Sequence, residues 1–306
     1  MRYRLKHIFE YAVLRSVIGL VTVVPYRVAL GLGWVIASIS RPFLRKKMKR
    51  TATRIRSVLG PEPSDREIER MVRRAWLQLC WVAIEGMRTS RMTADWIRKM
   101  VDLRDLHMIA DNMKDGRGVI VAVPHLGNWE LAGVACTRMG VRLMTIARSQ
   151  RNPLTDAYLE RMREQAGLEC YESRSAAFVG ILRGLREGKS LAILPDLRGK
   201  GGAYRCRYLG AETDIPSGMA RFAREAGVPI IPAFTYREGW GRYVLRGFDP
   251  VWPDTSLDRD EDGRRMTQYV MDCLDRAVRE HPEQYFWFNN RWVLGKETTG
   301  ANPPSK

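Results

Sequence analysis

His125 and Glu130 stand where the chain changes from a strand to a helix. Residues 119–123 form a short apolar run rich in β-branched residues, which predicts a buried strand. Asn128 is a good N-cap for a helix predicted over residues 129–139. His125 therefore falls in the turn past the carboxyl end of a strand, which is where open α/β sheets bind their ligands.

The residue types in this turn suit general base catalysis. An imidazole in a crevice, beside a carboxylate that orients it, can take a proton from a substrate. Glu130 falls in the first helical turn, where the positive end of the helix dipole favours a carboxylate. Backbone N–H groups near Gly127 and Asn128 are candidates to stabilise an oxyanion. A polar turn followed by an ordinary first-turn glutamate explains the same residues, and their spacing alone does not decide between the two.

Two more polar residues are expected near the same edge of the sheet. Asp196 ends the apolar run 191–195, so it should lie on the sheet edge that carries His125. The loop over residues 197–202 is basic and glycine-rich and is a candidate to hold phosphate. Arg163, on a predicted helix, is a candidate to pair with Asp196 or to bind phosphate. The alternatives are a turn-initiating aspartate and a solvated arginine.

Composition limits the function classes. The chain has 306 residues, of which 45% are apolar, and 51 basic residues against 34 acidic ones give a net charge of +17. This excess indicates an anionic partner: nucleic acid, an anionic membrane surface or a phosphorylated substrate. The five cysteines have no metal or redox spacing, which favours a reducing compartment. With four histidines and no His-Glu-x-x-His motif, we expect no bound metal.

Two common catalytic motifs do not occur in the sequence. Residues 184–190 resemble a phosphate-binding loop but have one residue too few between the glycines. They also follow a predicted helix and precede a predicted strand, which reverses the order that such a loop requires. The chain has no Gly-x-Ser-x-Gly motif, which argues against a serine hydrolase.

The N-terminal region is apolar between basic flanks. Residues 11–40 are interrupted only by two arginines and a proline, and the basic residues of 41–50 follow. Neither half reaches the roughly 18–20 apolar residues of a confident span, so residues 1–43 are expected to form a membrane anchor of interfacial or re-entrant helices. A single span and a buried helical hairpin of a soluble protein are the alternatives. The flanks favour both ends in the cytoplasm, and a basic run in place of a cleavage site argues against a signal peptide.

The rest of the chain predicts an α/β fold. Helical patterns fill residues 44–59 and 64–112, where Ser64 and Glu67 read as a capping box. Further strands are predicted over 142–147, 168–171, 191–194, 204–209, 228–236 and 243–248, and helices over 152–165, 176–186, 217–225 and 264–280. This alternation implies a mostly parallel central sheet flanked by helices, in one domain over 44–296, with a disordered tail over 297–306.

Taken together, these residues resemble a known family. His125 and Glu130 fit the His-x4-Asp/Glu signature of membrane glycerolipid and glycolipid acyltransferases. The wider pattern is similar to the lipid A biosynthesis lauroyl and myristoyl acyltransferases. Arg163 falls on that family's functional arginine, and Pro195-Asp196 falls on its Pro-Asp pair. The phosphatidylinositol mannoside acyltransferases belong to the same superfamily.

The resemblance spans nearly the whole chain. Arg148 with Asn152-Pro153-Leu154 resembles a second family stretch, and residues 282–288 with Arg291-Trp292 resemble the closing motif. The chain departs from the family at two places. Leu197-Arg198 stands where Gln or His and then Asp usually follow the Pro-Asp pair, and Arg54 stands where an Asn is usual. Both departures bear on the acceptor more than on the reaction.

The resemblance implies an O-acyltransferase with His125 as the general base, oriented by Glu130. The donor would be an acyl thioester of acyl carrier protein or coenzyme A, and no metal or redox cofactor is needed. The acceptor would be a hydroxyl of a lipid A precursor or related glycolipid, with glycerophospholipid or phosphatidylinositol mannoside as the alternative. Arg163, Asp196 and Arg148 would support the site or bind substrate.

The implied location is the cytoplasmic face of the cell inner membrane, at a surface with anionic head groups. A non-catalytic basic protein that binds a membrane surface or nucleic acid is the competing hypothesis. It explains the net charge of +17 but gives no reason for His125 and Glu130 to lie at the sheet edge. The chain also lacks the interleaved aromatic and basic strands of a nucleic-acid surface, so we expect no nucleic-acid partner.

Overall fold

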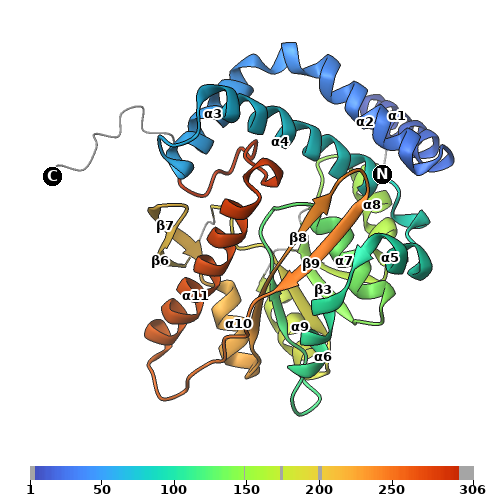
Figure 1. Ribbon diagram of the computed structural model, residues 1–306. Coiled ribbons are helices and arrows are strands. Elements are labelled where there is room, and N and C mark those ends of the chain that lie inside the picture. Colours follow the sequence, from blue (N-terminus) through green and yellow to red (C-terminus); the bar gives the residue numbers. More distant parts are fainter. Residues whose placement is uncertain (1–3, 148, 173–174, 199–201, 296–306) are drawn as a thin grey trace.

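The centre of the protein is a seven-stranded sheet in the order β1-β9-β8-β2-β5-β3-β4 (Figure 1). The computed structural model describes residues 4–147, 149–172, 175–198 and 202–295. The strands of the sheet are β1 (Val101–Asp102), β2 (Ile120–Ala122), β3 (Leu143–Ala147), β4 (Leu168–Glu172), β5 (Ser190–Ile193), β8 (Ile230–Glu238) and β9 (Arg242–Gly247). Strands β8, β2, β5, β3 and β4 run parallel, whereas β9 is antiparallel to β8. The predicted α/β fold with a mostly parallel sheet is confirmed.

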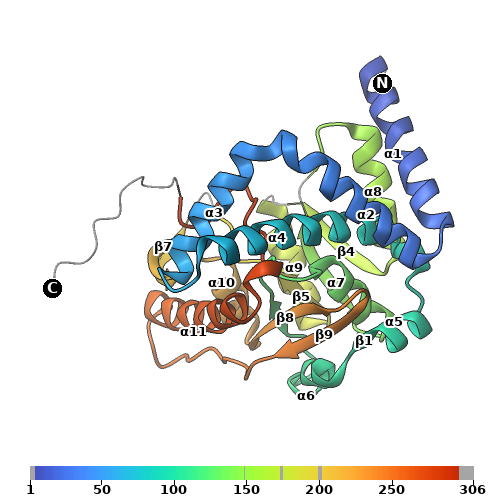
Figure 2. The same cartoon turned by 45° about the horizontal axis from the view of Figure 1, so that its top comes forward.

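Helices cover both faces of this sheet and one of its ends (Figures 1 and 2). The helices are α1 (Leu5–Val23), α2 (Tyr26–Ser40), α3 (Arg45–Leu59), α4 (Asp65–Gly86), α5 (Ala94–Met100), α6 (His107–Asp111), α7 (Trp129–Arg138), α8 (Pro153–Gln165), α9 (Ser175–Arg186), α10 (Gly218–Ala226) and α11 (Arg259–Glu280). Helix α4 crosses the end at which β8 and the strands parallel to it terminate, and α6 lies at the opposite end. The predicted capping box at Ser64 and Glu67 begins α4.

The sheet separates two hydrophobic cores because side chains alternate along a strand. In β2, Ile120 and Ala122 belong to the core under α9, α10 and α11, whereas Val121 belongs to the core under α5 and α7. An apolar run without polar alternation is what a strand buried on both faces requires. This explains why the sequence predicts β2 and β5 from their composition alone.

The expected N-terminal membrane anchor is wrong. No helix among the residues described is long and apolar enough to cross a membrane. Helix α2 has 15 residues, about 23 Å at 1.5 Å per residue, against a hydrocarbon core of about 30 Å. Helix α1 carries Lys6, Glu10 and Arg15. Instead, α2 packs along α4, and α1 lies beside α8 (Figure 2), where Tyr11 meets Tyr158 edge-on at 6.0 Å.

Two strands and one helix start were not predicted. Strand β7 (Ala211–Pro216) pairs with β6 (Ala203–Tyr208) in a separate hairpin, and β1 interrupts the stretch predicted as wholly helical. Glu212 and Asp214 are exposed while Thr213 and Ile215 are buried, so β7 has the two-residue alternation of a half-buried strand despite its acidic composition.

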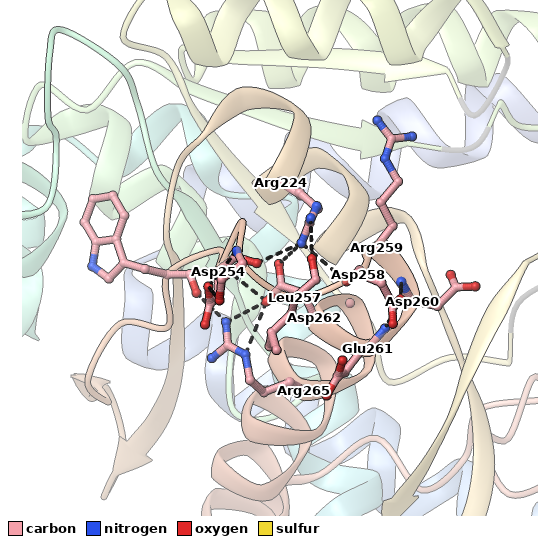
Figure 3. Close-up of polar contacts among 12 residues, drawn as sticks. Arg224, Asp254, Leu257, Asp258, Arg259, Asp260, Glu261, Asp262 and Arg265 are labelled. Carbon is pink, nitrogen blue, oxygen red and sulfur yellow. Dashed lines mark hydrogen bonds and ion pairs between the residues drawn. The ribbon is translucent and has the colours of Figure 1, made fainter.

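The start of α11 is fixed by a buried aspartate (Figure 3). The Asp262 side chain is fully buried and accepts hydrogen bonds from Arg224 at 2.8 Å, from Arg265 at 2.7 Å and from the backbone N–H of Asp254 at 3.2 Å. Arg224 also donates to the Leu257 carbonyl at 2.8 Å. These contacts join α10, α11 and the loop between β9 and α11, because removing any one partner leaves buried polar groups unpaired.

Replacing this aspartate should destabilise the fold. Asp262→Ala leaves the partly buried Arg224 guanidinium without its carboxylate, at a cost of up to about 3–5 kcal/mol in the free energy of unfolding. Asp260→Ala is the matched control, since Asp260 is exposed in the same first turn, where a carboxylate contributes about 0.3–1 kcal/mol. Urea denaturation followed by circular dichroism measures both. Equal losses in the two variants would contradict this account.

Candidate active site

His125 and Asp196 meet at the edge of the sheet. Strands β2 and β5 pair in parallel with Ala122 opposite Ile193, so both end at the same edge, and each of the two polar residues follows three residues later. The Nδ1 atom of His125 lies 2.6 Å from Oδ1 of Asp196, and the backbone N–H of His125 donates to Oδ2 at 2.8 Å. The carboxylate therefore holds both the backbone and the ring of His125.

This contact fixes the tautomer of the imidazole. An ionised carboxylate only accepts hydrogen bonds, so Nδ1 must carry the hydrogen, and the lone pair of the neutral ring is then on Nε2. Within the described part of the chain, Nε2 has no hydrogen-bond partner. The side chain of His125 is 14% exposed and that of Asp196 is fully buried. The arrangement is a general base with its orienting group behind it.

The surroundings of Asp196 are buried and aromatic. Burial, reinforced by the charge of Asp196, raises the pKa of Tyr208 and of Tyr285 well above the ordinary value for tyrosine. Both phenols therefore stay neutral around the carboxylate. The ring of Trp129 meets the imidazole edge-on at 5.0 Å, and Phe286 stacks on Trp129 at 5.9 Å. These two rings restrict the positions open to the imidazole.

The turn that carries His125 is held from its other side by the C-terminal segment. The N–H of Phe286 donates to the carbonyl of His125 at 2.9 Å, and the N–H of Gly127 donates to the carbonyl of Gln284 at 3.1 Å. Gly127 has φ +60°, and a Cβ there would lie 2.0 Å from the carbonyl oxygen of Thr235. Only glycine allows this close approach of the turn to β8.

A buried glutamate on α4 supports the same turn and was not predicted. Glu85 accepts hydrogen bonds from Asn128 Nδ2 at 2.8 Å, Arg237 Nη2 at 2.6 Å and Tyr243 at 2.5 Å, and also from the Tyr26 hydroxyl. It thus ties α2, β8 and β9 to the residue that begins α7. The available signal was a charged residue at a position of α4 whose helical neighbours are apolar.

Asn128 acts as the predicted N-cap, and its Oδ1 accepts from the N–H of Leu131 at 2.9 Å. Of the two oxyanion candidates, the N–H of Gly127 is bound to Gln284. For the N–H of Asn128 the described residues provide no hydrogen-bond partner. The N-terminal end of α7 therefore offers one candidate donor beside His125.

Glu130 lies in the first turn of α7, as predicted, but it does not bind the imidazole of His125. It is exposed, and in residues 4–295 as described it makes no hydrogen bond to His125. The structure places Asp196 in the orienting position that the sequence analysis gave to Glu130. The predicted pairing of Arg163 with Asp196 is likewise not formed, since Asp196 is bound to His125. The roles of Glu130 and Arg163 stay predictions.

Glu130 and Arg163 share a neighbouring side chain and line the same cavity. Burial raises the pKa of the Cys170 thiol; Arg163 opposes that shift and Glu130 reinforces it, so both charges act on the same side chain. Both also line the cavity that opens at His125.

Arg148, the third supporting candidate, and residues 199–201 of the basic loop lie outside the described residues. Arg198 of that loop instead contacts the C-terminal segment, through its N–H to the carbonyl of Arg291 at 3.4 Å.

An apolar cavity of about 290 Å³ starts at His125. It runs between α7 and the sheet toward α6, and we call it cavity 1. Its polar residues at the site are His125, Glu130 and Arg163. Most other lining residues are apolar, among them Val121, Val123, Ala132, Gly133, Cys136, Leu143, Leu168, Ala192, Ile231, Met108 and Ile109. Asp105, Thr145 and Arg246 are further polar residues of its lining. A mostly apolar cavity with a base at its mouth suits a hydrocarbon chain with a reactive group at its head.

The chain matches a family of known enzymes. Residues 3–293 match the family described as bacterial lipid A biosynthesis acyltransferase. The palmitoleoyltransferase of lipid A biosynthesis from Escherichia coli strain K12 is 22% identical over 273 residues, which are 88% of this chain and 86% of that protein.

Mycobacterial proteins are similar over a shorter stretch. The phosphatidylinositol mannoside acyltransferase of Mycolicibacterium smegmatis is 23% identical over 215 residues, or 68% of each chain. The protein of the same name from Mycobacterium tuberculosis strain CDC 1551 is 23% identical over 184 residues, which are 58% of this chain and 55% of that protein. The chain therefore spans about half the length of the latter relative.

The tautomer of His125 provides a direct test of the geometry. Nitrogen-15 NMR of the imidazole rings in the wild-type protein should show His125 with its hydrogen on Nδ1, the form that Asp196 stabilises. Asp196→Ala should remove this preference. Glu130→Gln should keep it, because in the part of the chain that the structure describes Asp196, and not Glu130, is bonded to the ring.

The signal of His125 is assigned by comparison with His125→Gln. His107 provides an internal control, since its ring is exposed and neither variant changes the Arg104 carbonyl to which its Nδ1 is bonded. Loss of the Nδ1–H form in Glu130→Gln, with the form retained in Asp196→Ala, would reverse the assignment of the orienting carboxylate.

Proposed function

The chain belongs to the bacterial lipid A biosynthesis acyltransferase family and is an acyltransferase. On that premise we propose that it transfers a fatty acyl group from an acyl thioester to a hydroxyl of a glycolipid, in the first place a lipid A precursor. The observation that carries this proposal is the pairing of His125 with Asp196 at the mouth of an apolar cavity. A hydrocarbon chain and a base are the two things that the reaction needs side by side.

In the proposed reaction Nε2 of His125 takes the proton of the acceptor hydroxyl while that oxygen attacks the thioester carbonyl. Asp196 holds the ring and stabilises its charged form. In this reaction the N–H of Asn128 stabilises the oxyanion. When the tetrahedral intermediate collapses, the carbon–sulfur bond breaks and the thiolate leaves with the proton from the imidazolium. No metal or redox cofactor takes part in these steps.

Glu130 and Arg163 are assigned to the polar part of the substrates. Both residues line cavity 1 together with His125, but the hydrogen bonds of the described residues join His125 to Asp196 and not to either of them. A carboxylate binds sugar hydroxyls, and a guanidinium binds phosphate or carbonyl oxygens. A glycolipid head group offers both kinds of partner.

The share of this chain that aligns with each relative favours lipid A precursors over phosphatidylinositol mannosides as the acceptor. The E. coli relative aligns over 88% of this chain, against 68% for the M. smegmatis relative, at nearly equal identity. The donor is proposed to be acyl carrier protein, because a net charge of +17 favours an acidic partner, with coenzyme A as the alternative. Both donors place the reaction at the cytoplasmic face of the inner membrane, where the basic residues meet anionic head groups.

Removing the base should leave a folded but slow enzyme. His125→Ala should lower turnover by roughly 10²–10⁴-fold, which is the usual contribution of a positioned general base. The assay measures transfer of a radiolabelled acyl chain from acyl carrier protein to a lipid A precursor, with phosphatidylinositol mannoside as the second acceptor. His107→Ala is the matched control, because His107 is exposed on α6.

Folding of both variants is checked by circular dichroism. A folded His125→Ala protein with near wild-type turnover would contradict the proposed mechanism. If only the mannoside accepts the chain, the mechanism stands and the proposed acceptor is wrong. Nucleic-acid binding without any acyl transfer would favour a non-catalytic function.

A further inference from the structure

A second apolar cavity meets cavity 1 at its polar rim. This space of about 310 Å³ is called cavity 2. Its lining comes from segments far apart in the sequence: Leu14 and Ile18 of α1, Val82 and Gly86 of α4, and further residues of α7, of α8, and of the segments that follow α4 and α8. Helices α1 and α8 lie side by side in Figure 2, and α4 contacts α7.

The two cavities share only four lining residues, Trp129, Glu130, Arg163 and Leu168. Two of the four, Glu130 and Arg163, are charged. Apart from this pair and Thr89, the residues that line cavity 2 are apolar or glycine. The two apolar spaces therefore diverge from one polar junction.

His125 distinguishes the two cavities. It lines cavity 1 and does not line cavity 2. A chain whose carbonyl reacts at Nε2 belongs in the cavity that contains the base, which is cavity 1. A hydrocarbon chain bound in cavity 2 would bring the polar head of its lipid to Glu130 and Arg163. The head would then lie next to His125 without its chain occupying the cavity that His125 lines. This is the position of a hydrocarbon chain that is bound during the reaction but not transferred.

We propose that cavity 2 binds a hydrocarbon chain of the acceptor lipid, and that Glu130 and Arg163 bind the acceptor head group at the junction. This assignment rests on the acyl transfer proposed above. It gives helix α1 a place in the substrate site, since α1 forms one wall of cavity 2. It also explains why Glu130 can stand in the first turn of α7 without holding the imidazole.

Glycines in the two cavities allow a matched experiment. A Cβ added at Gly86 meets no atom within 4 Å, so Gly86→Leu extends into open space in cavity 2. A Cβ at Gly133 lies 3.6 Å from Leu168, an ordinary contact, so Gly133→Val narrows cavity 1. Gly19→Leu is the control, because Gly19 is exposed on α1 and lines neither cavity. Ala83→Leu provides a second, exposed position in cavity 2.

Initial rates are measured with a fatty-acylated disaccharide phosphate as the acceptor and with the same disaccharide phosphate after its chains are removed. Each buried methylene is worth about fourfold in affinity. Gly86→Leu and Ala83→Leu should therefore raise KM for the acylated acceptor roughly 10–100-fold, because a leucine displaces several methylenes. For the deacylated acceptor, KM should match that of Gly19→Leu. Gly133→Val should shift the preferred donor chain to a shorter length, whereas the cavity 2 variants should keep the wild-type preference.

Three results would overturn the proposal. A shift of donor preference in Gly86→Leu and Ala83→Leu would assign cavity 2 to the transferred chain. Equal losses with the acylated and deacylated acceptors would indicate a general structural defect. Wild-type kinetics in both cavity 2 variants would show that the space binds no chain. If the wild-type protein transfers no acyl group to either acceptor, it is the proposed function that fails.

Discussion

The buried carboxylate of Asp196 is the interaction on which the site depends. It accepts one hydrogen bond from the ring of His125 and another from its backbone, so one group fixes the tautomer and the position of the base. A buried charge persists only when hydrogen bonds compensate for its lost hydration. The parallel pairing of β2 with β5 supplies this compensation, because it brings the ends of both strands to one edge. The α/β sheet is thus the means by which two residues 71 positions apart form one acid–base unit.

Three other contacts keep that unit in place, and they come from distant parts of the chain. The C-terminal segment bonds to the turn through Phe286 and Gln284, and α4 contributes Glu85, which binds the side chain of Asn128. In the same way, Arg54 of α3 donates to the carbonyl of Asn289 at 2.8 Å and so supports the C-terminal segment itself. The helices that cover the end of the sheet therefore do more than bury apolar surface. They define the shape of the turn from which the base projects, and α4 also lines cavity 2.

The sequence predicts those parts of this arrangement that depend on local pattern. The apolar runs before His125 and Asp196, and the N-cap at Asn128, are confirmed because each requires only neighbouring residues. The choice between Glu130 and Asp196 as orienting group depends on strand pairing, which spacing along the chain does not reveal. The N-terminal anchor was wrong for a related reason. Helix α2 packs on α4, helix α1 packs on α8, and Leu14 and Ile18 of α1 line cavity 2, and the apolar pattern does not distinguish these uses from contact with lipid.

A double-mutant cycle on His125 and Asp196 tests the central claim most directly. Acyl transfer is measured for His125→Ala, Asp196→Asn and the double variant, with folding checked by circular dichroism. If the carboxylate acts through the imidazole, the double variant should be scarcely slower than His125→Ala, because the aspartate has nothing left to orient. If the two losses multiply instead, the residues act independently, and the acid–base unit described here does not exist.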